Sequence, residues 1–514
     1  MIIYDTTLRD GEQSPDVKLS MRDKLEIAKA LDDFKVDYIE LGWPASNEKE
    51  MECFLQANNL NLKNAKIAAF GSTKKKGVRA EEDVNLKAIV ASKAKTATIF
   101  GKGWLEHVEK QLKLTPEENL NTIKESVEFL KSAHLVVIYD AEHYFDGFKA
   151  HPDYALSCLK AAEKADCLVL CDTNGGSLPS EINEIIIKTK GYLEKNKIGC
   201  KLGIHCHNDS GLAVANTLEA VKLGINHVQG TINGLGERTG NADLCQVLPN
   251  IKFKLKKSLK QDLTKLTMLS NLVYTLTNIK PASNQPFVGR GAFSHKGGIH
   301  VDAVTKGASY EHINPGLVGN KRDFILSELS GRANIVGVAR GFGIEAKKDD
   351  ERTLRMLKGV ERLEKLGYNI GDLKAEQFLL VQEFFSSKKD LFKVDSWRIS
   401  TQQKHGEFSE CIIEGTVNSK KRRIVSSVKG GPVDATFQAL KKLIGEEYVG
   451  IEDVKLINYK VMIAEELGAK SSVRVYIEFK NHNEEWGTVG VSTNILEASL
   501  EAIKKGFRYF LLKN

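Results

Sequence analysis

The chain has no run of apolar residues that approaches the ~20 needed for a membrane-spanning helix. It begins Met1-Ile-Ile-Tyr-Asp5, without the basic segment, apolar run and small-residue cleavage site of a secretory signal. Its eight cysteines stand singly with no CxxC pair, which argues against a disulfide framework and against a structural zinc site. We therefore expect a soluble, cytoplasmic protein.

No aromatic residues interleave with the three short basic runs, at 74–76, 254–257 and 420–423. Nucleic-acid surfaces combine clustered positive charge with a recognisable reading motif, and none accompanies these runs. The net charge of +7 is modest for 514 residues. It would suit small anionic substrates, and we expect neither nucleic acid nor a membrane as a partner.

What the chain does contain, over residues 1–271, is a regular alternation of short β-branched runs with amphipathic helical stretches. Strands that alternate with helices pair in parallel. Eight such units in ~250 residues are typical of a TIM barrel, a (β/α)8 fold of the α/β class. The predicted strands are 2–8, 36–42, 66–71, 96–101, 135–140, 168–172, 201–207 and 227–232.

After residue 271 the alternation stops. Residues 272–391 hold a glycine-rich loop and helical stretches such as 349–366, which predicts a helical linker. From residue 392 onward, short strand patterns return and two helices are indicated, at 432–443 and 495–509. The sequence thus predicts a third part, residues 392–514, that forms a separate α+β domain.

Polar residues gather at the carboxyl ends of the predicted barrel strands, where TIM-barrel active sites lie. His205 and His207 are two residues apart on a strand, so both imidazoles point the same way. Because strand eight of a closed barrel lies between strands seven and one, Asp10 and Asn241 come from the elements next to these histidines. Two nitrogens and two oxygens, with positions left for water or substrate, predict a catalytic divalent metal site.

Three more residues belong to this predicted rim: Arg9 beside Asp10, Glu142 after strand five, and Thr173 at the end of strand six. Arg9 has two readings. It forms a rim ion pair, or it is a cation beside the metal that clamps a carboxylate and stabilises an oxyanion.

The loop 233–241 carries three glycines within seven residues, Gly234, Gly236 and Gly240. Glycines allow a backbone to approach a ligand closely. The spacing matches neither a dinucleotide fingerprint nor a P-loop. By itself this loop predicts only a ligand-binding loop.

Seven segments of the chain stand out as motifs: three span the barrel, two lie in the linker and two lie in the last domain. In chain order they are Asp5-Thr-Thr-Leu-Arg-Asp-Gly-Glu-Gln13, Gly203-Ile-His-Cys-His-Asn-Asp209, Gly234-Leu-Gly-Glu-Arg-Thr-Gly-Asn241, Ser294-His-Lys-Gly-Gly-Ile-His-Val-Asp302, Tyr310-Glu-His-Ile-Asn-Pro315, Gly431-Pro-Val-Asp-Ala435 and Val489-Gly-Val-Ser492. The three barrel segments resemble the signature set of the 2-isopropylmalate, homocitrate and citramalate synthases. The resemblance continues through the linker segments and the last domain, which is similar to the allosteric dimerisation (LeuA-type) domain of these enzymes.

Two shorter segments resemble the branch of the family that uses pyruvate, the citramalate synthases. They are Ala141-Glu-His-Tyr-Phe-Asp-Gly-Phe-Lys149 and Cys171-Asp-Thr-Asn-Gly-Gly176. This resemblance implies condensation of acetyl-CoA with pyruvate to citramalate, with isoleucine as the logical effector. The alternative is a sister synthase that uses 2-oxoisovalerate, with leucine as effector, or 2-oxoglutarate.

Carried onto matching positions, the resemblance implies that Asp10, His205, His207 and Asn241 bind one divalent ion: Mn, Mg, Zn or Co. It implies that Arg9 stabilises the enolate and that Thr173 holds the keto acid's carboxylate. Glu142 is placed on the catalytic rim, with His300 and Tyr310 reaching in from the linker of this chain or of a partner subunit in a homodimer. Acetyl-CoA is expected beside Gly234, Gly236, Glu237, Arg238 and Gly240.

Several alternatives stay open from the sequence. The general base is Glu142 or His300: His300 titrates in the right range, whereas Glu142 needs burial to raise its pKa. Tyr310 is catalytic or is a packed aromatic with a satisfied hydroxyl. A lyase on the same barrel is disfavoured by the last domain, and a non-catalytic amino-acid sensor is disfavoured by the intact predicted metal set.

Overall fold

The computed structural model describes residues 1–297, 303, 310–327, 330–371, 373–386, 391–402, 408–464 and 471–513. The chain forms two compact units. One comprises Met1–Phe293 and Ile313–Lys321, and the other comprises Ser294–His312 and Arg322–Asn514. Within the described ranges, no helix is both long and apolar enough to cross a membrane.

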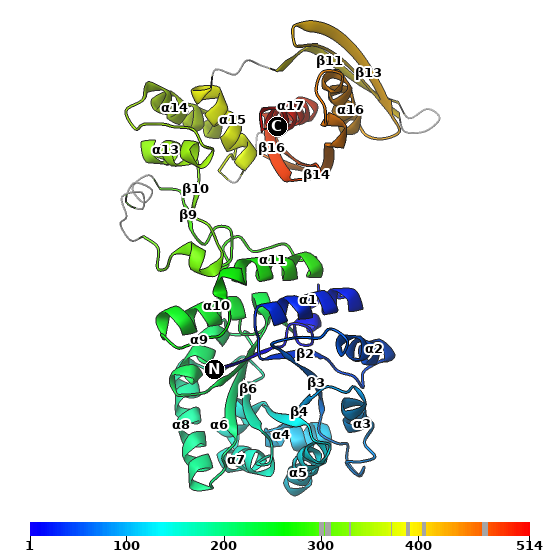
Figure 1. The fold of residues 1–514 in the computed structure, drawn as a ribbon, viewed down its shortest axis with the longest axis vertical. Helices are drawn as coiled ribbons and strands as arrows, with labels where there is room; N and C mark the ends of the chain where they lie inside the picture. The colour runs from blue at the N-terminus through cyan, green and yellow to red at the C-terminus, as the bar shows by residue number, and fades with distance from the viewer. Residues whose placement is uncertain are drawn as a thin grey trace. The chain divides into compact units, whose positions relative to one another are not determined.

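The first unit is built on eight parallel strands that close into a barrel, as the sequence predicts (Figure 1). Closure is direct, because Ile2 to Asp5 of the first strand pair with His227 to Gly230 of the last. The strands are β1 (Ile2–Asp5), β2 (Tyr38–Gly42), β3 (Lys66–Ser72), β4 (Thr96–Lys102), β5 (Val136–Glu142), β6 (Cys167–Asp172), β7 (Lys201–Cys206) and β8 (His227–Gly230).

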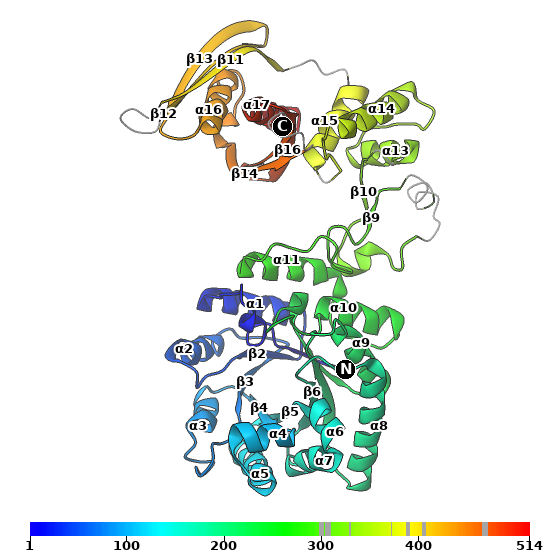
Figure 2. The same ribbon diagram turned by 180° about the vertical axis from the view of Figure 1, so that it is seen from behind.

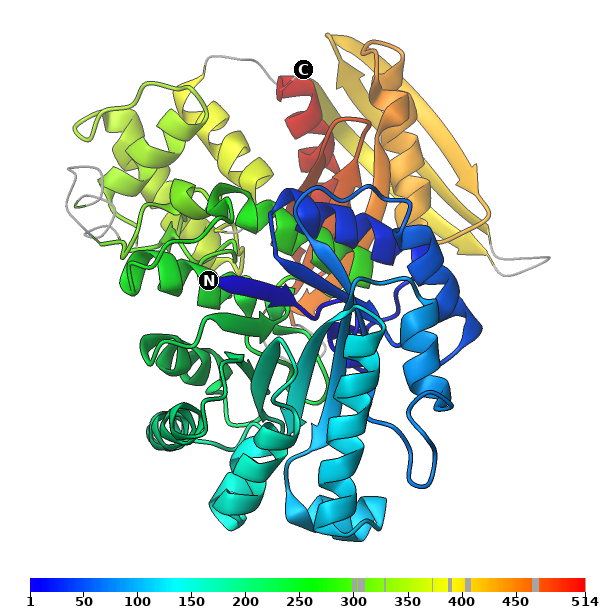
Figure 3. The same cartoon turned by 60° about the horizontal axis from the view of Figure 1, so that its bottom comes forward.

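The helices of this unit lie outside the strands (Figures 1 and 3). Local signals set where they begin. At the start of α5, the Thr115 hydroxyl accepts the Glu118 amide, the Glu118 carboxylate accepts the Thr115 amide, and Pro116 occupies the first turn. The helices are α1 (Met21–Asp33), α2 (Glu48–Ala57), α3 (Val84–Ala91), α4 (Leu105–His107), α5 (Pro116–Ser132), α6 (Tyr144–Ala150), α7 (Pro152–Ala161), α8 (Pro179–Lys195), α9 (Ala213–Lys222), α10 (Leu244–Pro249) and α11 (Leu266–Thr277).

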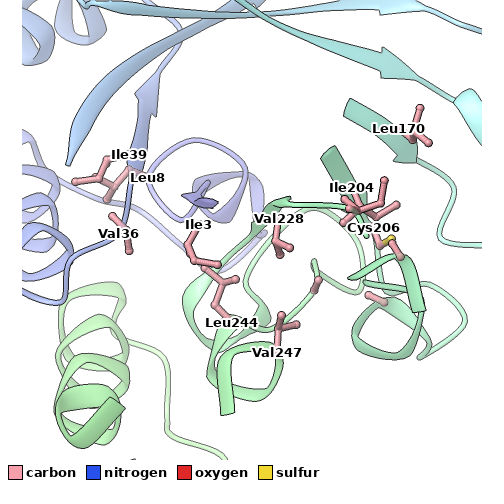
Figure 4. Packing of buried hydrophobic residues seen from close by; sticks show 14 of the residues in the cluster. Ile3, Leu8, Val36, Ile39, Leu170, Ile204, Cys206, Val228, Leu244 and Val247 are labelled. Carbon is pink, nitrogen blue, oxygen red and sulfur yellow. The ribbon is translucent and has the colours of Figure 1, made fainter. Parts of the chain in front are cut away.

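Alternation along the strands divides the core into two layers. Outward residues such as Ile3 and Val228 join the large cluster between strands and helices, near Leu244 of α10 (Figure 4). Inward residues form a small apolar cluster that contains Tyr4 and Val169. The remaining barrel interior is polar, because inward positions of several strands carry ionisable or amide side chains that are fully buried. This polar interior holds the site described below.

In the described part of the second unit, helices α13 to α15 precede two antiparallel three-stranded sheets (Figure 2). Helix α16 packs on the first sheet and α17 on the second, and Phe437 of α16 stacks on Phe507 of α17 at 5.3 Å between ring centroids. The elements are β9 (Ser294–His295), β10 (Asp323–Phe324), α13 (Arg332–Gly341), α14 (Glu351–Lys365), α15 (Lys374–Phe385), β11 (Phe392–Gln402), β12 (Phe408–Val417), β13 (Lys420–Val428), α16 (Pro432–Gly445), β14 (Lys455–Ile463), β15 (Val473–Lys480), β16 (Glu485–Ser492) and α17 (Ile495–Lys513).

The expected fold class, a barrel followed by helices and a C-terminal sheet-and-helix domain, is confirmed. Some local predictions were wrong. The first strand ends at Asp5 and not at residue 8, because the chain turns where the amides of Arg9, Asp10 and Gly11 all bond the Thr6 carbonyl. The division at residues 271 and 391 stays a prediction, and α11 runs through the first of these positions.

Candidate active site

Three buried side chains converge at the carboxyl ends of β1 and β7. The Nε2 atoms of His205 and His207 lie 3.3 Å apart. Asp10 Oδ2 lies 3.5 Å from His205 Nε2 and 3.9 Å from His207 Nε2. Among the described residues, this is the one cluster of three or more His, Cys, Asp or Glu whose ligand atoms are close enough to hold a metal ion. The structure therefore brings together three of the four predicted ligands.

The electrostatics of this cluster suit a cation. Burial opposes ionisation, but the charge of the Arg9 guanidinium holds the pKa of Asp10 well below its usual range. Burial, followed by the charge of His205, lowers the pKa of His207 to about 3. The carboxylate is thus ionised and the His207 imidazole neutral, which is the protonation state that metal ligands require.

Two buried oxygens at this place have no hydrogen-bond partner in the described part of the chain: Asp10 Oδ1 and Asn241 Oδ1. Asn241 pairs with His207 in an antiparallel bridge, so their side chains lie side by side. A buried oxygen without a partner is costly unless a cation satisfies it. The donor set therefore fits a divalent ion, with Asn241 as a candidate fourth ligand.

Arg9 is held in place on three sides. Its Nε donates to Glu40 Oε1 at 2.5 Å, its Nη1 lies 3.3 Å from Asp10 Oδ2, and its Cζ stands 3.7 Å from the centre of the Phe70 ring. Glu40 is fully buried and also accepts the Tyr4 hydroxyl at 2.5 Å. Arg9 is therefore a fixed positive charge beside the predicted metal site. The ion-pair reading is observed, and a role for Arg9 in stabilising an oxyanion stays a prediction.

A cavity of about 170 Å³ opens over this cluster. Its floor contains Arg9, Asp10 and both histidines, and its wall includes three aromatic rings, of Trp43, Phe70 and Phe100. Trp43 packs edge-on against both phenylalanines, which stack on each other at 5.3 Å. The other lining residues are Gln13, Asp140, Glu142, Cys171, Thr173 and Glu237.

Glu142 and Thr173 both line this cavity, as the sequence predicts for rim residues. Glu142 Oε2 lies 2.6 Å from the buried ammonium of Lys102. The Thr173 hydroxyl oxygen accepts the His143 backbone amide at 2.8 Å, which leaves the hydroxyl hydrogen available for a ligand in the cavity.

The glycine loop lies beside the cluster. Gly234 and Gly240 have φ of 65° and 90°, in the left-handed region where glycine is favoured. Arg238 anchors the loop with a two-pronged bond to Asp209, at 2.8 and 3.0 Å, and with a bond to the Thr173 carbonyl at 2.8 Å. Glu237 reaches the cavity wall. Acetyl-CoA binding at this loop stays a prediction.

The linker residues are less informative. His300 lies outside the described residues. Tyr310 is half exposed in the second unit. His295 Nε2 lies 3.0 Å from Glu311 Oε1, and this bond holds two parts of the segment together.

Four residues of the site were not found from the sequence: Glu40, Lys102, Asp140 and Gln229. All four are buried in strands. Glu40, Asp140 and Gln229 lie within runs that read as apolar core, and Lys102 comes directly after such a run. Asp140 lines the cavity, and burial together with Glu40 raises the pKa of Asp140 to about 7. One signal in the sequence could have found such residues, namely a polar side chain at an inward position near the carboxyl end of a barrel strand. Burying such a side chain costs free energy, so its presence there indicates a function.

Comparison with known proteins gives full-length matches. The HMGL-like family model matches residues 1–273, the homocitrate synthase post-HMGL domain-like model 287–377, and the LeuA allosteric (dimerisation) domain model 373–511. The (R)-citramalate synthase of Aquifex aeolicus (strain VF5) is 45% identical over 521 residues, covering 100% of this chain and 98% of the relative.

Two further relatives show how similar the chain is to each of two groups of enzymes. The (R)-citramalate synthase of Geobacter sulfurreducens is 44% identical over 521 residues, again with 100% and 98% of the two chains covered. The 2-isopropylmalate synthase of Methanocaldococcus jannaschii is 33% identical over 519 residues, covering 99% of this chain and 95% of the relative. The chain is thus more similar to the first group of enzymes than to this member of the second.

Proposed function

The chain belongs to the HMGL-like family and, within it, to the (R)-citramalate synthases, and we propose that it condenses acetyl-CoA with pyruvate and water to give (R)-citramalate and CoA. This is an acyltransferase reaction of isoleucine biosynthesis. A proton leaves the acetyl methyl group, the resulting carbon attacks the ketone carbon of pyruvate, and water then cleaves the thioester.

The observation that carries the proposal is the buried cluster of Asp10, His205 and His207 at the floor of a small cavity. These residues, with Asn241 as the fourth, would hold a divalent ion. When bound there, such an ion polarises the ketone of the keto acid. The mixed nitrogen and oxygen ligands admit Mn, Mg, Zn or Co.

Arg9 and Thr173 orient the substrate. The guanidinium is fixed by Glu40 and Phe70, so it offers its remaining donors to the cavity without reorganising. It counters the negative charge that develops on the enolate oxygen. The Thr173 hydroxyl donates to the keto acid's carboxylate, since its oxygen already accepts the His143 amide.

The proton is removed by Glu142 or His300. Glu142 lines the cavity and is positioned by Lys102, which supports its candidacy. We further propose that His300 and Tyr310 of the linker take part in catalysis, in this chain or from a partner.

The shape of the cavity supports pyruvate as the keto acid. A small cavity of about 170 Å³, lined by the rings of Phe70, Phe100 and Trp43, is consistent with a small keto acid. Among the described side chains, Arg9 is the one arginine or lysine in the cavity lining, and the nearby Lys102 already pairs with Glu142. The cavity therefore offers no further cation to pair with the second carboxylate of 2-oxoglutarate.

The last domain points to regulation. A match to the LeuA allosteric (dimerisation) domain indicates an oligomeric enzyme. We propose a cytoplasmic homodimer that binds isoleucine in this domain and is inhibited by it, because isoleucine is the end product downstream of citramalate. Titration calorimetry with isoleucine and leucine tests the choice of effector.

The deciding experiment measures the release of free CoA thiol from acetyl-CoA with Mn²⁺ or Mg²⁺ present. Pyruvate, 2-oxoisovalerate and 2-oxoglutarate are compared at equal concentration. We expect a clear preference for pyruvate that a chelator abolishes. A preference for either larger acid would retain the mechanism but assign the chain to a sister synthase.

A further inference from the structure

A hydrogen-bonded chain runs behind the predicted metal site, across three strands of the barrel. His205 Nδ1 of β7 lies 3.0 Å from Gln229 Oε1 of β8. Gln229 Nε2 donates to Asp140 Oδ1 of β5 at 3.1 Å. All three side chains are at least nine-tenths buried, so water does not compete for these bonds.

The hydrogen bonds of this network have a fixed donor-to-acceptor direction, because each group can only donate or accept as its chemistry allows. An ionised carboxylate only accepts hydrogen bonds, so the amide NH₂ of Gln229 must face Asp140. The amide oxygen then faces His205, and Nδ1 of that ring must carry the hydrogen. Nε2 is left with its lone pair toward Asp10 and His207, which is the orientation that metal binding needs.

We propose that Asp140 is a positioning residue that, acting through Gln229, holds His205 in the metal-binding tautomer and ring orientation. The inference rests on the proposed function, because it concerns the same metal site. Asp140 and Gln229 do not themselves bind the ion. They support a ligand, and residues in this role typically contribute about 10- to 100-fold to metal affinity.

A structural role alone would not require this arrangement. Asp140 stands in a strand where apolar residues fill the neighbouring positions, and burying its carboxylate costs free energy. Gln229 is fully buried and has both ends of its amide engaged, one by the ligand and one by the carboxylate. A relay to His205 uses both residues, whereas an apolar pair would pack as well.

Exchanging the carboxylate at position 140 with the amide at position 229 tests the direction of these hydrogen bonds. Asp140→Asn removes the group that can only accept, so the Gln229 amide is free to turn. Gln229→Glu removes the donor and places two carboxylates together. In the double variant, the new carboxylate at position 229 accepts both from His205 and from the new amide at position 140, which restores the original direction.

The measurement is the Kd for Mn²⁺ by titration of the full chain at pH 8, where Asp140 is ionised. We expect each single variant to bind about 10- to 100-fold more weakly than wild type, and the double variant to regain most of the loss. Equal binding by wild type and Asp140→Asn, or a double variant as weak as the singles, would overturn the inference.

A control separates folding from positioning. Asp32 is a buried carboxylate at the end of α1 that accepts the amides of Lys63, Asn64 and Ala65. Asp32→Asn is expected to lower the thermal stability of the metal-free protein but to leave the Kd for Mn²⁺ unchanged. If wild type itself fails to bind Mn²⁺, the metal-dependent function is wrong, and that result differs from a failure of the relay alone.

Discussion

Lys102 and Glu142 are register partners at the ends of adjacent strands, and their side chains form an ion pair at 2.6 Å. The Lys102 side chain is 9% exposed and that of Glu142 is 23% exposed. A buried cation therefore holds the one carboxylate that the sequence predicted as a candidate base. Glu142 is fixed at the cavity by this pair.

The first prediction concerns this pair. Glu142→Gln should lower kcat by about 10²- to 10⁴-fold, the range for loss of a general acid or base, without changing the Kd for Mn²⁺. Lys102→Met should lower kcat less, because the carboxylate remains but loses its anchor. Steady-state kinetics with pyruvate and acetyl-CoA checks both.

Lys110→Met serves as control, since Lys110 forms an exposed pair with Glu106. It should leave the kinetics unchanged. Wild-type turnover by Glu142→Gln would instead assign the base to His300.

The second prediction concerns metal binding. A ligand present at 100 times its Kd stabilises the folded chain by about 2.7 kcal/mol. Mn²⁺ should therefore raise the Tm of the wild type but not that of Asp10→Asn, which loses the negative ligand. Asp16→Asn, at an exposed position, should respond as wild type does. A metal-dependent rise in Tm for Asp10→Asn would count against Asp10 as a ligand.

The third prediction tests Asn241 through its neighbour. A Cβ at Gly236 would stand 2.1 Å from Asn241 Nδ2, so Gly236→Ala must displace that side chain. We expect weaker Mn²⁺ binding and a higher KM for acetyl-CoA. Gly199→Ala is the matched control, because nothing lies within 4 Å of a Cβ there. Unchanged Mn²⁺ affinity in Gly236→Ala would show that the chain does not need Asn241 as a ligand.

The fourth prediction concerns stability and pH. His227 is buried between Tyr4 and Tyr38 at the amino end of β8, and burial followed by Lys201 lowers the pKa of His227 from 6.5 to about 3. Below pH 6.5 the unfolded chain binds a proton that the folded chain does not. This residue's contribution to stability is therefore present above pH 6.5 and is lost as pH falls toward 3, on the order of 1.4 kcal/mol per pH unit.

His227→Phe removes this titration while keeping an aromatic ring. The free energy of unfolding, measured by urea at several pH values between 4 and 7, should depend less on pH in the variant than in the wild type. Parallel curves for the two proteins would mean that His227 does not titrate differently on unfolding.

The pattern of the sequence was enough to predict the barrel. Eight β-branched runs separated by helical periodicity have few solutions other than closure, and closure places strand eight between strands seven and one. The predicted metal ligands followed from that topology, since His205 and His207 share a strand face and Asp10 follows strand one, with only strand eight between. Residue type and local periodicity carry this information because both act over a few residues.

The tertiary structure alone decided which buried polar groups meet. Glu40, Asp140 and Gln229 lie far apart in the chain and inside runs that read as core. The barrel nevertheless brings Glu40 against Arg9, and it brings Gln229 and Asp140 behind His205. Their contacts depend on the stagger between strands and on side-chain rotamers in a packed interior, which the period of a pattern does not specify. The sequence by itself therefore determined the fold and predicted the metal ligands, and the packing of the closed barrel determined how those side chains are held.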